Sequence, residues 1–132
     1  MDFYDSLLEY LQNEGCHPKE EDFGIAFYVE GLLFFYITEP GDDLSFRLYR
    51  PWILQNVNDD YEYAVLKAMN EVTASMKLVK LYFKENAYGQ RDVWGEFSIR
   101  LDFPPDIDDV MNRAIDLLYS VGEEFLSRLQ NG

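Results

Sequence analysis

The sequence predicts an α+β fold, in which a five-stranded antiparallel sheet packs against three helices in the order α-β-β-β-α-β-β-α. Three observations lead to this prediction. Residues 77–103 alternate between apolar and polar side chains, and the two runs 59–76 and 106–129 repeat apolar residues every three or four positions. The 132 residues, 48% of them hydrophobic, also suffice for one well-packed core. We therefore expect a single domain over residues 1–132.

The first helix is expected over residues 2–14. Phe3, Leu7 and Leu11 recur every four residues, which is typical of a helix with one buried face. Asp2 is a suitable N-cap, and Gly15 favours the end of the helix. A charged connection is expected from Cys16 to Asp22, because Pro18 prevents the helix from continuing.

Three strands are expected next, at residues 22–30, 32–38 and 44–50. Gly31 predicts a tight turn between the first two, and the run 39–43, which contains Pro40 and Gly41, predicts a reverse turn before the third. Residues 51–57 are expected to form a crossover connection. The three strands at 22–30, 32–38 and 44–50 would make an antiparallel meander.

The second helix is expected to begin near Asn58 or Asp59. Asp59 as the cap would place Glu62 at the third helical position, as in a capping box. Its apolar stripe would contain Tyr61, Val65, Ala68, Met69, Val72 and Met76.

Residues 77–84 and 92–103 then predict an antiparallel hairpin, because both alternate with a period of two and a polar run with Asn86 and Gly89 joins them. The polar side of the second strand would hold Trp94, Glu96, Ser98, Arg100 and Asp102.

The last helix is expected to follow Phe103 and two prolines, with Asp106 as its cap. Asp108 and Asp109 favour the positive end of the helix dipole, so we interpret this acidic run as a helix start and not as a cation site.

The charge of the chain limits its partners. It carries 25 acidic and 11 basic residues, a net charge of -14. Residues 1–46 contain eleven acids and one base, whereas residues 47–100 contain seven acids and eight bases. Nucleic acids and anionic membranes both require positive charge, so we expect neither as a partner. Acidity that only keeps an aromatic-rich protein soluble is the simpler interpretation.

The single cysteine, Cys16, allows no intramolecular disulfide, which fits a reducing compartment. The first residues lack the basic and apolar regions of a signal peptide, and the most apolar run, 31–37, is too short to span a membrane. We expect a cytoplasmic protein.

Catalytic chemistry is not indicated. The only histidine, His17, adjoins Cys16 in a loop, and sequence neighbours do not naturally form a nucleophile–base pair. The chain lacks the usual zinc ligand sets and a glycine-rich phosphate loop. We therefore predict no enzyme, no catalytic residues, no metal and no cofactor.

A protein-binding surface is predicted on the polar face of the sheet, since Trp, Tyr and Arg are enriched at interfaces. The candidate residues are Arg47, Tyr49, Lys80, Tyr82, Trp94 and Arg100. The same residues can also serve only as cross-strand pairs that stabilise the sheet. Tyr63 and Leu66, which lie off the apolar stripe of the second helix, are a candidate dimer interface unless a nearby loop covers them.

The order of elements resembles the type III secretion chaperone-like fold, and within it the YbjN-type family of bacterial sensory transduction regulators. The resemblance lies mostly in residues 77–84, the strand that ends at 99–103, and the closing helix from Asp106 with Phe125 near its end. It implies a non-enzymatic protein that binds a segment of a partner or client protein, with homodimers typical of the chaperones. It carries no catalytic residues over to this chain.

Our main hypothesis is a regulator-like or chaperone-like module that docks a partner segment on the sheet face or on a strand edge. An alternative is an acidic inhibitor or immunity protein that neutralises a basic toxin, which the net charge favours. An enzyme that uses carboxylates would instead require a deep pocket with acids of raised pKa.

Overall fold

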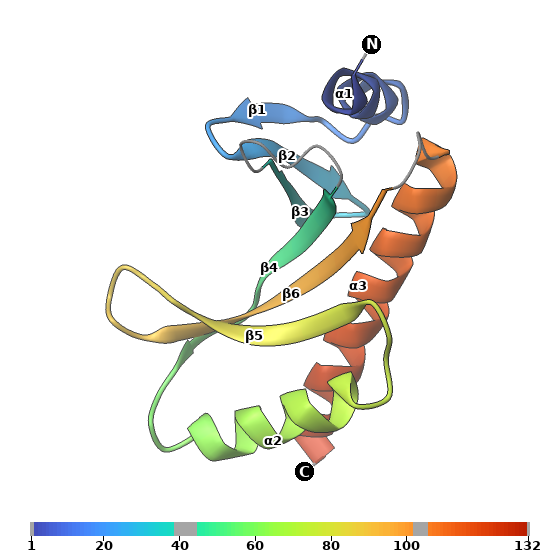
Figure 1. The fold of residues 1–132 in the computed structure, drawn as a ribbon. Coiled ribbons are helices and arrows are strands. Elements are labelled where there is room, and N and C mark those ends of the chain that lie inside the picture. Colours follow the sequence, from blue (N-terminus) through green and yellow to red (C-terminus); the bar gives the residue numbers. More distant parts are fainter. Residues whose placement is uncertain (1, 39–44, 102–105, 132) are drawn as a thin grey trace.

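Six antiparallel strands form one twisted sheet, and three helices pack on one of its faces (Figure 1). The computed structural model describes residues 2–38, 45–101 and 106–131. The strand order is β1-β2-β3-β4-β6-β5, which makes β1 and β5 the two edges. The elements are α1 (Phe3–Asn13), β1 (Lys19–Glu21), β2 (Gly24–Val29), β3 (Leu32–Ile37), β4 (Ser45–Val57), α2 (Glu62–Thr73), β5 (Val79–Glu85), β6 (Arg91–Arg100) and α3 (Ile107–Asn131).

The predicted α+β class and antiparallel sheet are confirmed, but the strand count is six and not five. The additional strand, β1, lies in the run that we expected to be a charged connection. Its three residues pair with β2 from Lys19↔Ala26 to Glu21↔Gly24. Three polar residues carry no periodicity, so this strand depends on its neighbour and not on its own sequence.

Strand β4 is also longer than predicted, because residues 51–57 continue it instead of forming a crossover. Its pairing with β6 shifts register between Arg50 and Leu54 and again between Leu54 and Val57. Such bulges insert residues into one strand and break the apolar–polar alternation. The interrupted pattern explains why this half of the strand was missed.

The predicted helix ends are partly confirmed. The Asp2 carboxylate accepts a hydrogen bond from the Asp5 amide at 2.9 Å, and Asp106 caps α3 through the Asp109 amide at 3.4 Å. The capping box of α2 is wrong: the helix starts at Glu62, and Tyr61, at its N-cap, has no side-chain cap bond. The predicted reverse turn at 39–43 and the end of the last strand at 102–103 lie outside the described residues.

The main core lies between the sheet and the helices. Phe46 and Leu48 of β4, Phe97 of β6, and Leu118 and Phe125 of α3 are all fully buried in it. In β6 the residues that alternate with the predicted polar side point toward the helices: Val93 and Phe97 are fully buried, and a Cβ built on Gly95 would touch Leu118 of α3 at 3.3 Å. The polar members of the alternation consequently point away from the helices.

A buried arginine joins the sheet to α3. Arg50 of β4 is 7% exposed, and its guanidinium donates hydrogen bonds to the backbone oxygens of Leu118 and Tyr119 at 3.4 and 3.3 Å. Glu123 lies 3.9 Å from the same group. The site has room for this because residue 122 is glycine: a Cβ there would stand 2.1 Å from Arg50 Nη1. Burial lowers the pKa of Arg50, and the nearby Glu123 opposes this shift.

Candidate protein-binding surface

The face of the sheet opposite the helices carries a second group of aromatic side chains. We call this face the outer face, and we call its five central rings the outer cluster: Phe35 of β3, Tyr49 and Trp52 of β4, Tyr82 of β5 and Trp94 of β6. The Trp94 ring centroid lies 5.8 Å from that of Phe35, 6.3 Å from that of Tyr49 and 5.7 Å from that of Trp52. Tyr82 is its cross-strand partner. No helix of the described residues packs over this cluster.

Trp94 lies on the predicted face, but the expectation that it is solvated is wrong. It is only 6% exposed, yet it does not belong to the core between sheet and helices. The neighbouring rings cover it, and the Lys84 ammonium lies 4.9 Å from its ring centroid. Sequence alternation correctly gave the side of the sheet, but it could not show that the side chains on that side cover one another.

Trp52 is a member of the cluster that sequence reasoning missed. It lies in the first bulge of β4, it is 45% exposed, and its backbone has φ = 52°. Positive φ is unusual for a bulky residue, and it is frequent at binding and active sites. The bulge brings the Trp52 ring against Phe35 and Trp94. The only sequence feature that could have indicated Trp52 is its position directly after Pro51, in a segment that has no apolar–polar periodicity.

One polar atom of the cluster has no partner. The Trp94 indole nitrogen, Nε1, is buried and has no hydrogen-bond acceptor among the described residues. Buried N–H groups are normally paired, because losing water without gaining another acceptor is unfavourable. Beside it, Tyr82 is half-buried, and this burial raises the pKa of its phenol, with Tyr49 and Glu96 adding to the shift.

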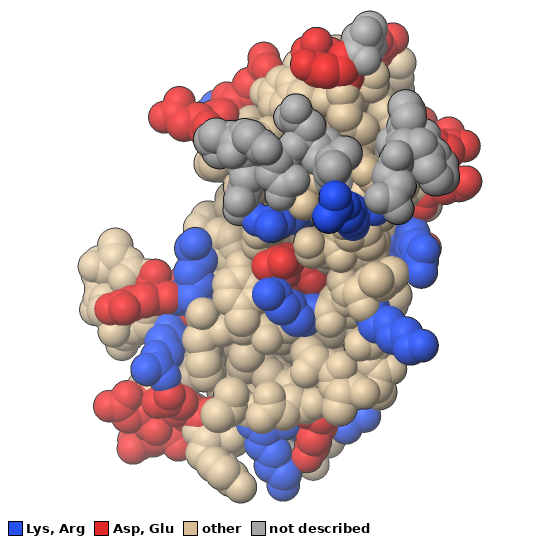
Figure 2. Space-filling view, in the orientation of Figure 1, with Lys and Arg blue, Asp and Glu red and all other residues tan. Residues whose placement is uncertain are grey.

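The part of the outer face that strands β4, β5 and β6 form is basic, although the protein is acidic. Over β4, β5 and β6 it carries four cations (Arg47, Lys80, Lys84 and Arg100) against two acids (Asp92 and Glu96), a difference of +2. Figure 2 shows Lys and Arg gathered over these strands, whereas Asp and Glu lie mainly around α1, β1, the β5–β6 hairpin and the start of α2. Glu96 pairs with Lys80 at 3.7 Å.

Asp92, the other acid, is buried and takes part in a local hydrogen-bond network. It accepts hydrogen bonds from the Asn56 backbone amide and the Asn86 side chain, both at 3.0 Å. Asn86 in turn donates to the Asn56 side chain at 2.8 Å. This network ties the β5–β6 turn to the end of β4 and so fixes the strands that carry Trp52, Lys84 and Trp94.

The predicted residues thus share one face but not one role. Trp94, Tyr82 and Tyr49 belong to the outer cluster, while Lys80 forms a salt bridge with Glu96. Arg47 and Arg100 lie further along β4 and β6, near the described ends of these strands. Tyr63 and Leu66 lie elsewhere, on α2, where they are 79% and 42% exposed. No loop of the described residues covers this flank.

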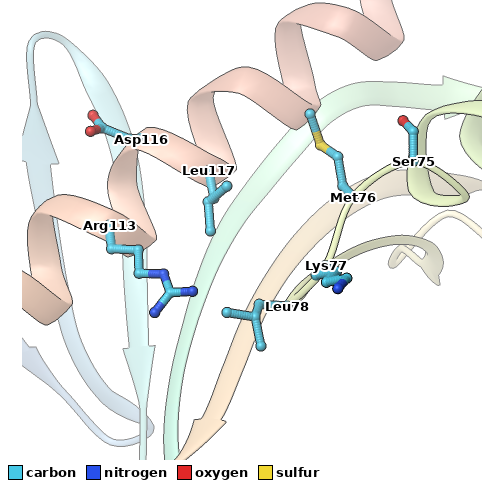
Figure 3. Close-up of a pocket in the computed structure, with 7 residues that line it drawn as sticks. All are labelled: Ser75, Met76, Lys77, Leu78, Arg113, Asp116 and Leu117. Carbon is cyan, nitrogen blue, oxygen red and sulfur yellow. The ribbon is translucent and has the colours of Figure 1, made fainter.

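A groove of about 570 Å³ lies between α3 and the start of the edge strand β5. In Figure 3, Met76 and Leu117 line it from the two sides, the Arg113 guanidinium extends toward Leu78, and Asp116 points away. It is a shallow, mostly apolar hollow with a cation at its rim. It lacks the paired carboxylates that acid–base chemistry would need.

The described residues offer little for other chemistry. Burial raises the pKa of the Cys16 thiol, which makes it a poorer nucleophile. Among residues 2–38, 45–101 and 106–131, no three His, Cys, Asp or Glu side chains come together as a metal site. None of the described helices combines the length and the apolar character that crossing a membrane requires.

Comparison with known proteins supports the fold. No model of a known protein family matches the sequence, and no curated protein matches it. Among solved structures, the chain is similar to YbjN from E. coli, described as a candidate transcription regulator, with a TM-score of 0.66 and 13% identity over 94% of this chain and 89% of that one. It is also similar to an uncharacterised protein from Methanothermobacter thermautotrophicus, with a TM-score of 0.64 and 11% identity over 96% of both chains.

Proposed function

The chain has the YbjN-like fold, and from this premise we propose that it is a non-enzymatic regulatory module that binds a segment of a partner protein on the outer face. The observation that carries the proposal is Trp52, an exposed tryptophan held at positive φ in a bulge against a buried tryptophan. A residue in this conformation costs about 1 kcal/mol or more, and such strain persists where the surrounding structure enforces it.

The composition of the face supports a protein partner. Tryptophan, tyrosine and arginine are the side chains that most often dominate binding energy, and they do so from positions near the centre of an interface. The outer cluster is central on the sheet, and the cations of β4, β5 and β6 surround it. The description of YbjN as a regulator agrees with a binding role, and the net charge of -14 favours a protein over DNA as the partner. We propose a cytoplasmic location, in agreement with the single cysteine.

Capture of partners by wild type and variants tests this function. Trp52→Gly removes the ring at a φ that glycine adopts readily, so the variant should fold. Tyr119→Ser, on the exposed side of α3, is the matched control. We expect the immobilised wild type and the control to retain the same specific protein from cells of the source organism, and Trp52→Gly to lose at least about tenfold of it. Equal retention by all three would contradict the proposal.

Two other surfaces are secondary proposals. The edge of β5, beside the groove in Figure 3, offers backbone groups to an added strand. The exposed α2 flank offers Tyr63 and Leu66 for self-association, for which sedimentation of wild type and Tyr63→Lys is the direct test.

The alternative function, an inhibitor of a basic toxin, would use a different surface from the outer face. A basic toxin would be held by the acidic residues around α1 and β1, and its binding would weaken steeply as salt increases. Such a partner would also be retained by Trp52→Gly, so the same capture experiment separates the two functions.

A further inference from the structure

We propose that the partner segment is acidic, and that one of its carboxylates accepts a hydrogen bond from Trp94 Nε1 while it pairs with the Lys84 ammonium. This inference rests on the proposed function, because it gives the chemistry of the segment that the outer face binds. It combines two groups that the fold brings together, a buried donor without an acceptor and a cation that lies over the same ring.

The donor is the first reason. Trp94 is more than nine-tenths buried, and its indole N–H has no acceptor among the described residues. The fold therefore leaves this group desolvated and unpaired, which is unfavourable until an acceptor arrives. An indole N–H only donates, so its complement is an oxygen acceptor, and a carboxylate is the strongest acceptor that a protein segment carries.

The cation is the second reason. Lys84 is exposed and forms no ion pair with any described residue, although the protein has a large excess of acids. Its cross-strand partner is Asp92, whose carboxylate is instead engaged with Asn56 and Asn86. Lys84 thus lies over an aromatic ring with no carboxylate of the described residues within ion-pair distance, and a carboxylate from a partner could pair with it directly.

Access is the third reason. The groups that cover Trp94 include two that are themselves exposed, the flexible Lys84 side chain and the Trp52 ring. A partner would reach the indole by displacing either of these two side chains. The Trp52 ring would then pack on an apolar neighbour of the carboxylate, so the expected segment alternates acidic and apolar residues in an extended conformation.

The chain contains only two tryptophans, and both belong to this cluster. Nitrogen-15 labelling of tryptophan therefore gives two indole N–H signals, which the variants Trp52→Phe and Trp94→Phe assign. The probe is a capped peptide, Gly-Asp-Phe-Asp-Phe-Asp-Gly, and its control replaces each Asp by Asn. We expect the Asp peptide to shift the Trp94 indole proton downfield in a saturable way, with an affinity about tenfold above that of the Asn peptide.

Matched lysine variants locate the second contact. Lys84→Met keeps the apolar stem and removes the charge, and we expect it to weaken binding of the Asp peptide about tenfold but not binding of the Asn peptide. Lys67→Met, on the exposed side of α2, is the control and should change neither affinity.

The outcomes separate this inference from the proposed function. If both peptides shift only Trp52, or bind with equal affinity, the outer face binds extended segments but the carboxylate contact is wrong. If neither peptide shifts either indole, this inference is overturned and the outer face loses its support as a peptide-binding surface. Equal effects of Lys84→Met and Lys67→Met would also overturn the assigned contact.

Discussion

The two faces of the sheet bury aromatic rings in different ways. Phe97, on the helix side, is fully buried in the core between the sheet and the helices, and its side chain has no polar atom to satisfy. Trp94, on the outer face, lies among neighbouring rings and a lysine, and its indole nitrogen has no acceptor in the part of the chain that the structure describes. The difference teaches that burial alone does not identify the core: what covers a side chain decides whether it stabilises the fold or remains available to a partner.

The largest expected difference between the two faces comes from replacing one aromatic ring on each face by alanine. Phe97→Ala should lower the free energy of unfolding by about 4 kcal/mol, because it leaves a cavity in a closed interior. Phe35→Ala should lower it by only about 1–2 kcal/mol, since the ring is partly exposed and water can occupy its place. Urea denaturation of both variants measures the two values, and equal losses would show that the outer cluster is an ordinary core.

The contact between Arg50 of β4 and helix α3 should give the next largest change in the free energy of unfolding. Gly122→Ala should destabilise the protein by about 3 kcal/mol, because its Cβ displaces the buried Arg50 guanidinium from the Leu118 and Tyr119 oxygens. At an exposed helix position, Gly→Ala would stabilise the protein by up to about 1 kcal/mol. The sign of the change in unfolding free energy therefore shows whether the Cβ displaces Arg50.

The control for this substitution is Ser120→Ala, at an exposed position of the same helix, which should be nearly neutral. Combining Gly122→Ala with Arg50→Met should recover at least about 1 kcal/mol, since the shorter side chain relieves the clash. If Gly122→Ala were as stable as Ser120→Ala, the proposed role of the Arg50 contact with α3 would be contradicted.

The smallest expected effect is a loss of stability at alkaline pH, which involves one tyrosine on the helix side of the sheet and one on the outer face. Burial, followed by a 2.7 Å hydrogen bond to Glu20, raises the pKa of Tyr4 on α1 to about 12. The folded pKa is thus above the unfolded value of 10.0, so this stabilisation is complete below pH 10 and is lost as the pH rises toward 12. Tyr82 on the outer face also has a raised pKa.

Thermal midpoints at pH 9 and pH 11 measure this loss. We expect both Tyr4→Phe and Tyr82→Phe to show a smaller decrease than wild type, because phenylalanine has no proton to lose. Tyr88→Phe, at the exposed β5–β6 turn, should decrease as wild type does. If the midpoints of Tyr4→Phe and Tyr82→Phe decreased as much as that of the wild type, the raised pKa values assigned to these two tyrosines would be contradicted.

The sequence predicted the parts of the fold that follow a regular period. The alternation of β6 gave both of its faces correctly, and the four-residue spacing of Leu7 and Leu11 gave the buried side of α1. Strand β1 and the second half of β4 were missed, because one is too short for a period and the other is interrupted by two register shifts. Both depend on pairing with strands that are distant in sequence.

The candidate surface was predicted in part for the same reason. Trp94 and Tyr82 were assigned to the correct face, but Trp52 was missed because a bulge and not alternation places it there. The buried indole nitrogen and the position of the Lys84 ammonium over the same ring follow from contacts between strands, which no local pattern contains. Periodicity therefore locates a surface, and tertiary contacts decide its chemistry.

The bulge in β4 also limits how far a disturbance can travel. Pairing with β6 is fixed on both sides of Trp52, at Arg50↔Gly95 and at Leu54↔Val93. A change of backbone angles at Trp52 can be absorbed within the three residues between these anchors. The backbone at Trp52 can therefore change its angles while β4 and β6 keep their pairing on both sides of it.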